Sequence, residues 1–98
     1  MEITACKNED TLTLTVKGRL DTITAPKLES ELKNYISSVK ELIFDFSELE
    51  YISSAGLRVL LSAQKFMNKQ GSMILKNVCD NVMEVFEITG FVDILNIE

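Results

Sequence analysis

The chain has 98 residues and a mass of 11.0 kDa, which is enough for one domain with a single hydrophobic core. Its 10 lysine and arginine residues against 15 aspartate and glutamate residues leave a net charge of −5, which argues against nucleic acid as a partner because phosphate neutralisation needs clustered cations. It contains no histidine, which excludes imidazole-based triads and most zinc sites. No apolar run approaches the roughly 18 residues that span a bilayer, and Met1–Thr4 does not resemble a secretory signal, so we expect a cytoplasmic protein without a membrane segment.

The first half of the chain predicts a hairpin, a helix and a buried strand. Apolar residues alternate with threonines in Thr11–Lys17, a period of two that is typical of a half-buried strand. The turn residues Asn8–Asp10 join this strand to a preceding one at Ile3–Lys7. A helical stripe of apolar residues then occupies Pro26–Val39, and the nearly continuous apolar segment Leu42–Phe46 predicts a strand covered on both faces, as in a parallel sheet.

The second half predicts two helices and two short strands. Ser54–Lys69 is a helix whose polar residues form one narrow exposed stripe, so its other positions, Phe66 included, are expected to face the core. Met73–Leu75 predicts a short buried strand, Asp80 is expected to cap a helix that ends at Gly90, and Ile94–Ile97 predicts a last strand. Strands and helices therefore alternate after the hairpin. This pattern predicts a single α/β domain over residues 1–98, with helices packed against a mostly parallel mixed sheet.

The segment Leu49–Leu61 is the part of the sequence that points to chemistry. A loop follows a buried strand, presents Ser53 and Ser54, and leads into the buried helix. Ser54 is at or next to the N-cap, where its hydroxyl can accept a backbone N–H, so a structural cap alone explains it. Gly56 is a poor helix former and indicates a tight turn or a close approach to the backbone. The partial positive charge of a helix N-terminus would also stabilise a phosphate on Ser54.

These residues resemble a known family. Tyr51–Leu57, followed by Val59–Leu61, resembles the signature of STAS domains, specifically of the anti-sigma factor antagonists. The resemblance extends over essentially the whole chain. Gly18–Asp21 resembles the Gly-x-Leu-Asp motif after the second strand of the family, Ile43–Phe46 its central strand, and Val82–Phe91 its terminal helix and the turn after it.

The resemblance implies a phosphorylation switch with no catalysis, cofactor or metal of its own. The unmodified form would bind an anti-sigma factor that is also a serine kinase, which frees the sigma factor. Phosphorylation would end this binding, and a metal-dependent serine phosphatase would reverse it. The acceptor position, two residues before Gly56, falls on Ser54. Ser53 stands where the family often has aspartate and is the weaker candidate, and Ala55 replaces a common serine or threonine.

Asp21, Ser53, Ser54, Gly56 and Arg58 are the candidate partner-binding residues. By resemblance, Asp21 lies near the phosphorylation loop, and an Asx turn toward Thr24 explains the same residue equally well. Arg58 belongs to the exposed stripe of the second helix, where a solvated face explains it without any contact. We expect a monomer, although a short edge strand leaves pairing open.

Two other functions remain open from the sequence. A STAS domain that is never phosphorylated would be a scaffold or adaptor in a larger assembly, with the same fold and composition. An enzyme with Ser54 as nucleophile is disfavoured, because the Gly-x-Ser-x-Gly frame, a histidine base and a Ser-x-x-Lys pair are all absent. The four glycines are scattered and form no nucleotide-binding motif, so ATP and magnesium are expected to belong to the kinase.

Overall fold

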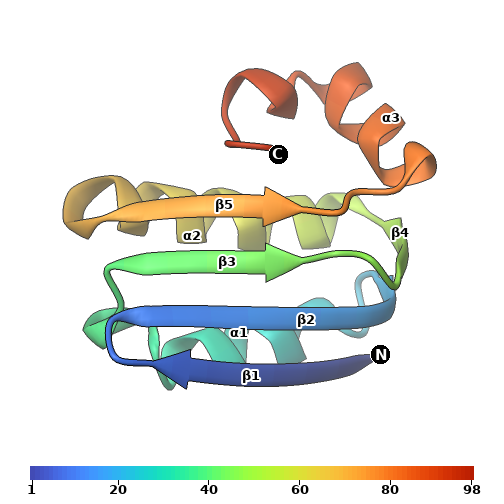
Figure 1. Cartoon of the computed structure of the whole chain (residues 1–98). Coiled ribbons are helices and arrows are strands. Elements are labelled where there is room, and N and C mark those ends of the chain that lie inside the picture. The colour runs from blue at the N-terminus through green and yellow to red at the C-terminus, as the bar shows by residue number, and fades with distance from the viewer.

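The computed structural model describes residues 1–98 and is built on a five-stranded mixed sheet (Figure 1). The strands are β1 (Glu2–Asn8), β2 (Thr11–Leu20), β3 (Glu41–Asp45), β4 (Leu49–Ile52) and β5 (Ser72–Lys76). β1 and β2 form the predicted antiparallel hairpin, and β3 and β5 continue the sheet in parallel, in the order β1-β2-β3-β5. β4 lies off this path and pairs in parallel with the end of β2. The predicted fold class is therefore confirmed.

The helices are α1 (Ala25–Lys33), α2 (Ser54–Gln70) and α3 (Asp80–Thr89), with 3-10 turns η1 (Ile36–Ser38) and η2 (Phe91–Asp93). In Figure 1, α1 and α2 lie behind the sheet, on one of its faces, and α3 lies at the end of the sheet near β4. No helix is both long and apolar enough to cross a bilayer.

Most of the hydrophobic core lies between the sheet and the two helices behind it, and Val82 and Phe86 of α3 extend it. The apolar residues of β2 and β3 that point toward α1 and α2, such as Leu14 and Phe44, are fully buried, whereas Thr13 and Ile43, on the opposite face, are only half-buried. The expectation that β3 is covered on both faces is wrong. Both crossover helices lie on the same side, so even the parallel part of this sheet is half-exposed.

The first helix is shorter than its apolar stripe predicts. α1 ends at Lys33, and the chain continues through η1 to Val39, which is buried. The side-chain amide of Gln70 donates hydrogen bonds to the carbonyls of Ile36 and Val39. Because a side chain from α2 satisfies these carbonyls, the segment keeps its apolar contacts without continuing the helix.

Three further expectations about local structure are wrong. Leu49–Ile52, expected in a loop, forms β4, which pairs with β2 through a register shift between Gly18 and Arg19. The predicted last strand is only one bridge between Ile97 and Leu75. In addition, the N-cap of α3 is Cys79 rather than Asp80, which is the first helical residue. The local sequence of a four-residue strand gives little indication of the strand, because its stability comes from a partner strand distant in the sequence.

Candidate functional site

The junction between β2, β4 and α2 brings two loops together. Leu20, the last residue of β2, pairs with Ile52, the last residue of β4. The backbone N–H of Ser53 then donates a hydrogen bond to the carbonyl of Leu20, with an N···O distance of 2.9 Å. The loop that begins at Asp21 and the start of α2 therefore emerge side by side from neighbouring strands, as the resemblance implies.

The two adjacent serines have opposite environments. Ser53 is the N-cap of α2, with an extended backbone (φ −104°, ψ 177°), and its Oγ is buried without a hydrogen-bond partner. Ser54 is the first residue of the helix and is exposed. Ser54 therefore lies next to the N-cap, as expected, but the helix has no side-chain cap bond, and its first intrahelical bond joins the N–H of Leu57 to the carbonyl of Ser53. A structural cap therefore does not explain Ser54, and its hydroxyl is accessible to another protein.

Gly56 allows the first turn of α2 to pack closely against the ends of the strands. A Cβ atom at Gly56 would lie 2.8 Å from Ile52 Cγ1 and 2.8 Å from Leu20 Cγ, closer than real carbon atoms approach. The first turn of α2 thus rests directly on the ends of β2 and β4, which is the close approach that the sequence indicates. Gly56 is itself buried, so it positions Ser54 and offers no surface of its own.

Asp21 shapes the neighbouring loop. Its Oδ1 accepts hydrogen bonds from the N–H of Ile23 (3.0 Å), the N–H of Thr24 (3.1 Å) and the Thr24 hydroxyl (3.1 Å), which is the Asx turn predicted from the sequence. The Thr24 N–H is the main cause that holds the pKa of Asp21 below its ordinary value of 3.8, and partial desolvation opposes it. Asp21 is therefore a structural residue of the loop that lies beside Ser53.

An aromatic–cation pair lies on the opposite side of the same strand ends. Arg19 and Tyr51 are register partners across β2 and β4, and the guanidinium carbon of Arg19 lies 4.1 Å from the centre of the Tyr51 ring. Arg19 Nε also lies 4.0 Å from the Oδ2 of Asp21. Sequence patterns do not predict this pair, because nothing in the local sequence indicates that these two residues are cross-strand neighbours.

Arg58 lies one helical turn after Ser54 on α2 and is exposed, as expected. Its guanidinium forms no ion pair. The remaining residues of the predicted exposed stripe, Ser62, Lys65 and Lys69, are also exposed. Ser54 thus stands at the start of a face of α2 that carries cations and no acidic residue.

The carboxylates at the strand ends do not form a metal-binding cluster. No group of three or more histidine, cysteine, aspartate or glutamate side chains could hold a metal ion. Asp45, the other carboxylate at a strand end, accepts hydrogen bonds from the Ser47 N–H (3.0 Å) and the Asn77 side-chain amide (3.1 Å). These two bonds, the first more than the second, lower the pKa of Asp45. Asp45 thus links the end of β3 to the residue that follows β5. The arrangement is that of a small α/β domain with an exposed serine, Ser54, at the start of α2.

Comparison with known proteins gives the family. The STAS domain model matches residues 2–98, so the chain belongs to the STAS domain family. BtrV of Bordetella bronchiseptica, which carries the name anti-sigma factor antagonist, is 38% identical over 96 residues, which cover 96% of this chain and 83% of that protein. The anti-sigma-B factor antagonist of Listeria monocytogenes is 35% identical over 96 residues, covering 94% of this chain and 82% of that protein.

Solved structures show the same fold. SpoIIAA, described as an anti-sigma factor antagonist and a Bacillus cell fate determinant, has been solved in an unphosphorylated and a phosphorylated form. The phosphorylated form superposes with a TM-score of 0.78 at 19% identity, covering 99% of this chain and 91% of that one. At this identity the likeness establishes the fold.

Proposed function

We propose that this protein is an anti-sigma factor antagonist that works by partner switching in the cytoplasm. Its unmodified form binds an anti-sigma factor that is also a serine kinase, and this releases the sigma factor. Phosphorylation of Ser54 ends the complex, and a metal-dependent serine phosphatase restores it. The protein itself performs no catalysis. The names of the curated relatives support this proposal, and one observation carries it: Ser54 is exposed at the start of α2 while the Oγ of Ser53 is buried.

A phosphate on Ser54 changes binding more than folding. It adds a charge of about −1.5 to −2 at a helix N-terminus, which offsets it by about 0.3–2 kcal/mol in the free protein. Weakening a complex a thousandfold requires about 4 kcal/mol. Removing water from an uncompensated dianion at an interface costs more than that. The modified domain therefore stays folded and loses its partner.

The modification is tested by incubating the chain with the anti-sigma factor kinase and ATP, followed by peptide mass spectrometry across Ile52–Arg58. Modification is expected at Ser54 only. The matched pair of variants is Ser54→Ala, which should abolish it, and Ser53→Ala, which should leave it unchanged because that hydroxyl is buried. Phosphate on Ser53, or none on either serine with an active kinase, contradicts the switch. The second of these results would favour the unphosphorylated scaffold.

The effect on binding is tested with Ser54→Asp and Ser54→Ala. The aspartate variant should lose affinity for the kinase while its circular dichroism spectrum and melting temperature stay close to those of the wild type. The alanine variant should remain bound, since the surface around the loop provides the affinity. If Ser54→Asp unfolds the domain, the interface account is wrong.

A further inference from the structure

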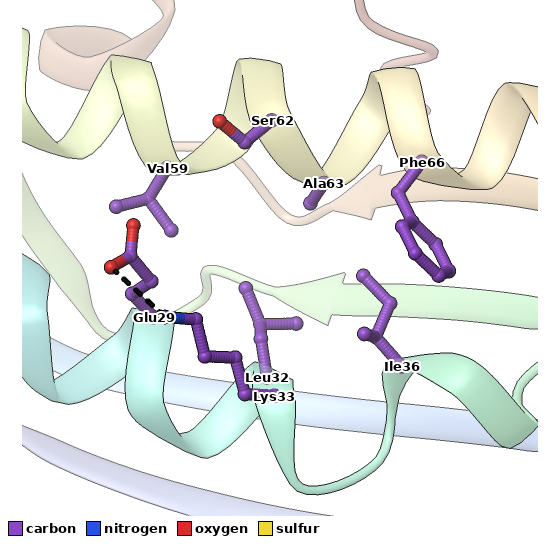
Figure 2. Close-up of a pocket in the computed structure, with 8 residues that line it drawn as sticks. All are labelled: Glu29, Leu32, Lys33, Ile36, Val59, Ser62, Ala63 and Phe66. Atoms are coloured by element: carbon purple, nitrogen blue, oxygen red, sulfur yellow. Dashed lines mark ion pairs between the residues drawn. The ribbon is translucent and has the colours of Figure 1, made fainter.

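A groove runs between α1 and α2 on the side of these helices away from the sheet (Figure 2). It has a volume of about 390 Å³. Its apolar lining comes from Leu32 and Ile36 on one side and from Val59, Ala63 and Phe66 on the other. Figure 2 shows the Phe66 ring and the Ile36 side chain on opposite sides of the groove.

Hydrophobic periodicity in the sequence predicts the wrong environment for Phe66. It is expected in the core, yet 42% of it is exposed. Neighbouring Met67, by contrast, is fully buried as predicted. A half-exposed phenylalanine beside an apolar floor is typical of an aromatic anchor that a partner covers.

The charges around the groove are asymmetric. On the α1 side, Glu29 and Lys33 pair with each other, with a distance of 3.8 Å between Oε1 and Nζ. A second hollow of about 440 Å³ adjoins the groove between the start of α1 and α2. It is bordered by Arg58 and Lys65 of α2 and, like the groove, by Glu29 of α1. Neither of these two cations forms an ion pair, although the chain as a whole carries a net charge of −5. Unpaired cations beside an apolar groove complement a partner with negative charge.

We propose that this groove is a docking site for an acidic amphipathic helix of a second protein. The lining residues of α2 extend from Val59 to Phe66, seven positions or about 10 Å along the helix axis. This length matches two turns of a bound helix, whose apolar residues at i, i+3 or i+4, and i+7 would face Phe66 and the groove floor. Its acidic residues would face Arg58 and Lys65. This docking site goes beyond the proposed switch at Ser54.

A second copy of this chain is a poorer occupant. Its α3 is acidic, with Asp80, Glu84 and Glu87, and its Ile88 is 77% exposed. However, Val82 and Phe86 of α3 are fully buried, and Met83 and Val85 are partly buried and packed against their own core. One exposed isoleucine cannot fill a groove that is two turns long.

The test uses the full chain, labelled for amide NMR, and a synthetic helical peptide of about 14 residues with leucines at i, i+3, i+4 and i+7 and glutamates beside them. Saturable shifts are expected in α1 and along Val59–Phe66. Phe66→Ala should weaken binding by about tenfold or more, as for a central aromatic contact. The double variant Arg58→Gln/Lys65→Gln should weaken peptide binding by a similar factor and make the affinity independent of salt concentration.

Matched controls are available in the same chain. Lys69→Gln removes a cation of the same helix outside the groove, and Ile88→Ala removes an exposed apolar side chain elsewhere, so both should bind as the wild type does. A peptide with lysines in place of the glutamates should bind more weakly. The proposal is overturned if the peptide shows no saturable binding or if the lysine peptide binds equally well. It is also overturned if the Phe66 and Arg58/Lys65 variants fold and bind the peptide with unchanged affinity. Dimers of the free chain in sedimentation that Phe66→Ala abolishes would instead assign the groove to a second copy.

Discussion

Ser53 and Ser54 are neighbours in the chain, but only one of them can meet another protein. The exposed hydroxyl of Ser54 stands above a turn that Gly56 holds against the sheet, whereas the hydroxyl of Ser53 is enclosed without a hydrogen bond. The family signature by itself predicts Ser54 as the acceptor, because its spacing from Gly56 is readable in the sequence. The burial of Ser53 is not readable there, since it depends on how the loop packs against the end of β2.

Arg58 is expected to interact with a phosphate on Ser54. The two residues are one turn apart on α2, where an anion and a cation attract each other, and the N-terminus of the helix also favours the dianion. Because both effects favour the more charged form, the second pKa of the phosphate should lie below its ordinary value of about 6. A phosphorus NMR titration of the phosphorylated chain measures it. Arg58→Gln should raise this pKa toward the ordinary value and Lys69→Gln should not; identical titrations for all three proteins would contradict the interaction.

Asp21 should make stability depend on acid pH. Hydrogen bonds from Thr24 and Ile23 favour the ionised carboxylate in the folded state, so its pKa there lies below the ordinary 3.8. The stability that it contributes is present above 3.8 and is lost as the pH falls through the lower, folded-state pKa. Urea unfolding should therefore show Asp21→Ala less stable than the wild type at neutral pH, with the difference shrinking below pH 3.8. Glu50→Gln, at an exposed carboxylate without polar contacts, is the control, and a pH-independent difference for Asp21→Ala would contradict this.

At the scale of elements, the contact between α2 and the ends of β2 and β4 determines the site. The hairpin, β3, β5 and the bounds of α2 follow from hydrophobic periodicity in the sequence, because each buries its own repeating face. β4 and the groove beside Phe66 do not follow from this periodicity, because both depend on which distant segments lie next to them. The alternation of strands and helices predicted from the sequence is interrupted at this point, where β4 directly follows β3.

Gly56→Ala tests this contact. Alanine favours a helix by about 1 kcal/mol over glycine, yet its Cβ would lie 2.8 Å from carbons of Leu20 and Ile52, so we expect a net loss of about 1–2 kcal/mol in the free energy of unfolding. In a Leu20→Ala background, which removes one of these carbons, the same substitution should cost less. Chemical denaturation of the four proteins in this cycle gives the coupling. A more stable Gly56→Ala variant in the wild-type background would show that helix propensity outweighs the contact.

At the scale of the whole molecule, the fold separates stability from regulation. The buried core lies between the sheet and the helices packed on it, whereas Ser54 is exposed at the start of α2 and the groove lies between α1 and α2. We therefore expect a charge added at Ser54 to change docking without disturbing the buried core. The sequence predicts a small α/β domain. It does not predict the surface that a partner contacts, because segments far apart in the sequence form that surface.

The most direct test is to measure, by isothermal titration calorimetry, how tightly the anti-sigma factor binds the unmodified chain and the chain fully phosphorylated on Ser54. The account predicts that phosphorylation weakens binding by about a thousandfold, which corresponds to about 4 kcal/mol. The melting temperature of the free domain should remain nearly the same. Equal affinities for the two forms would contradict the central claim, as would a loss of binding that accompanies unfolding of the phosphorylated chain.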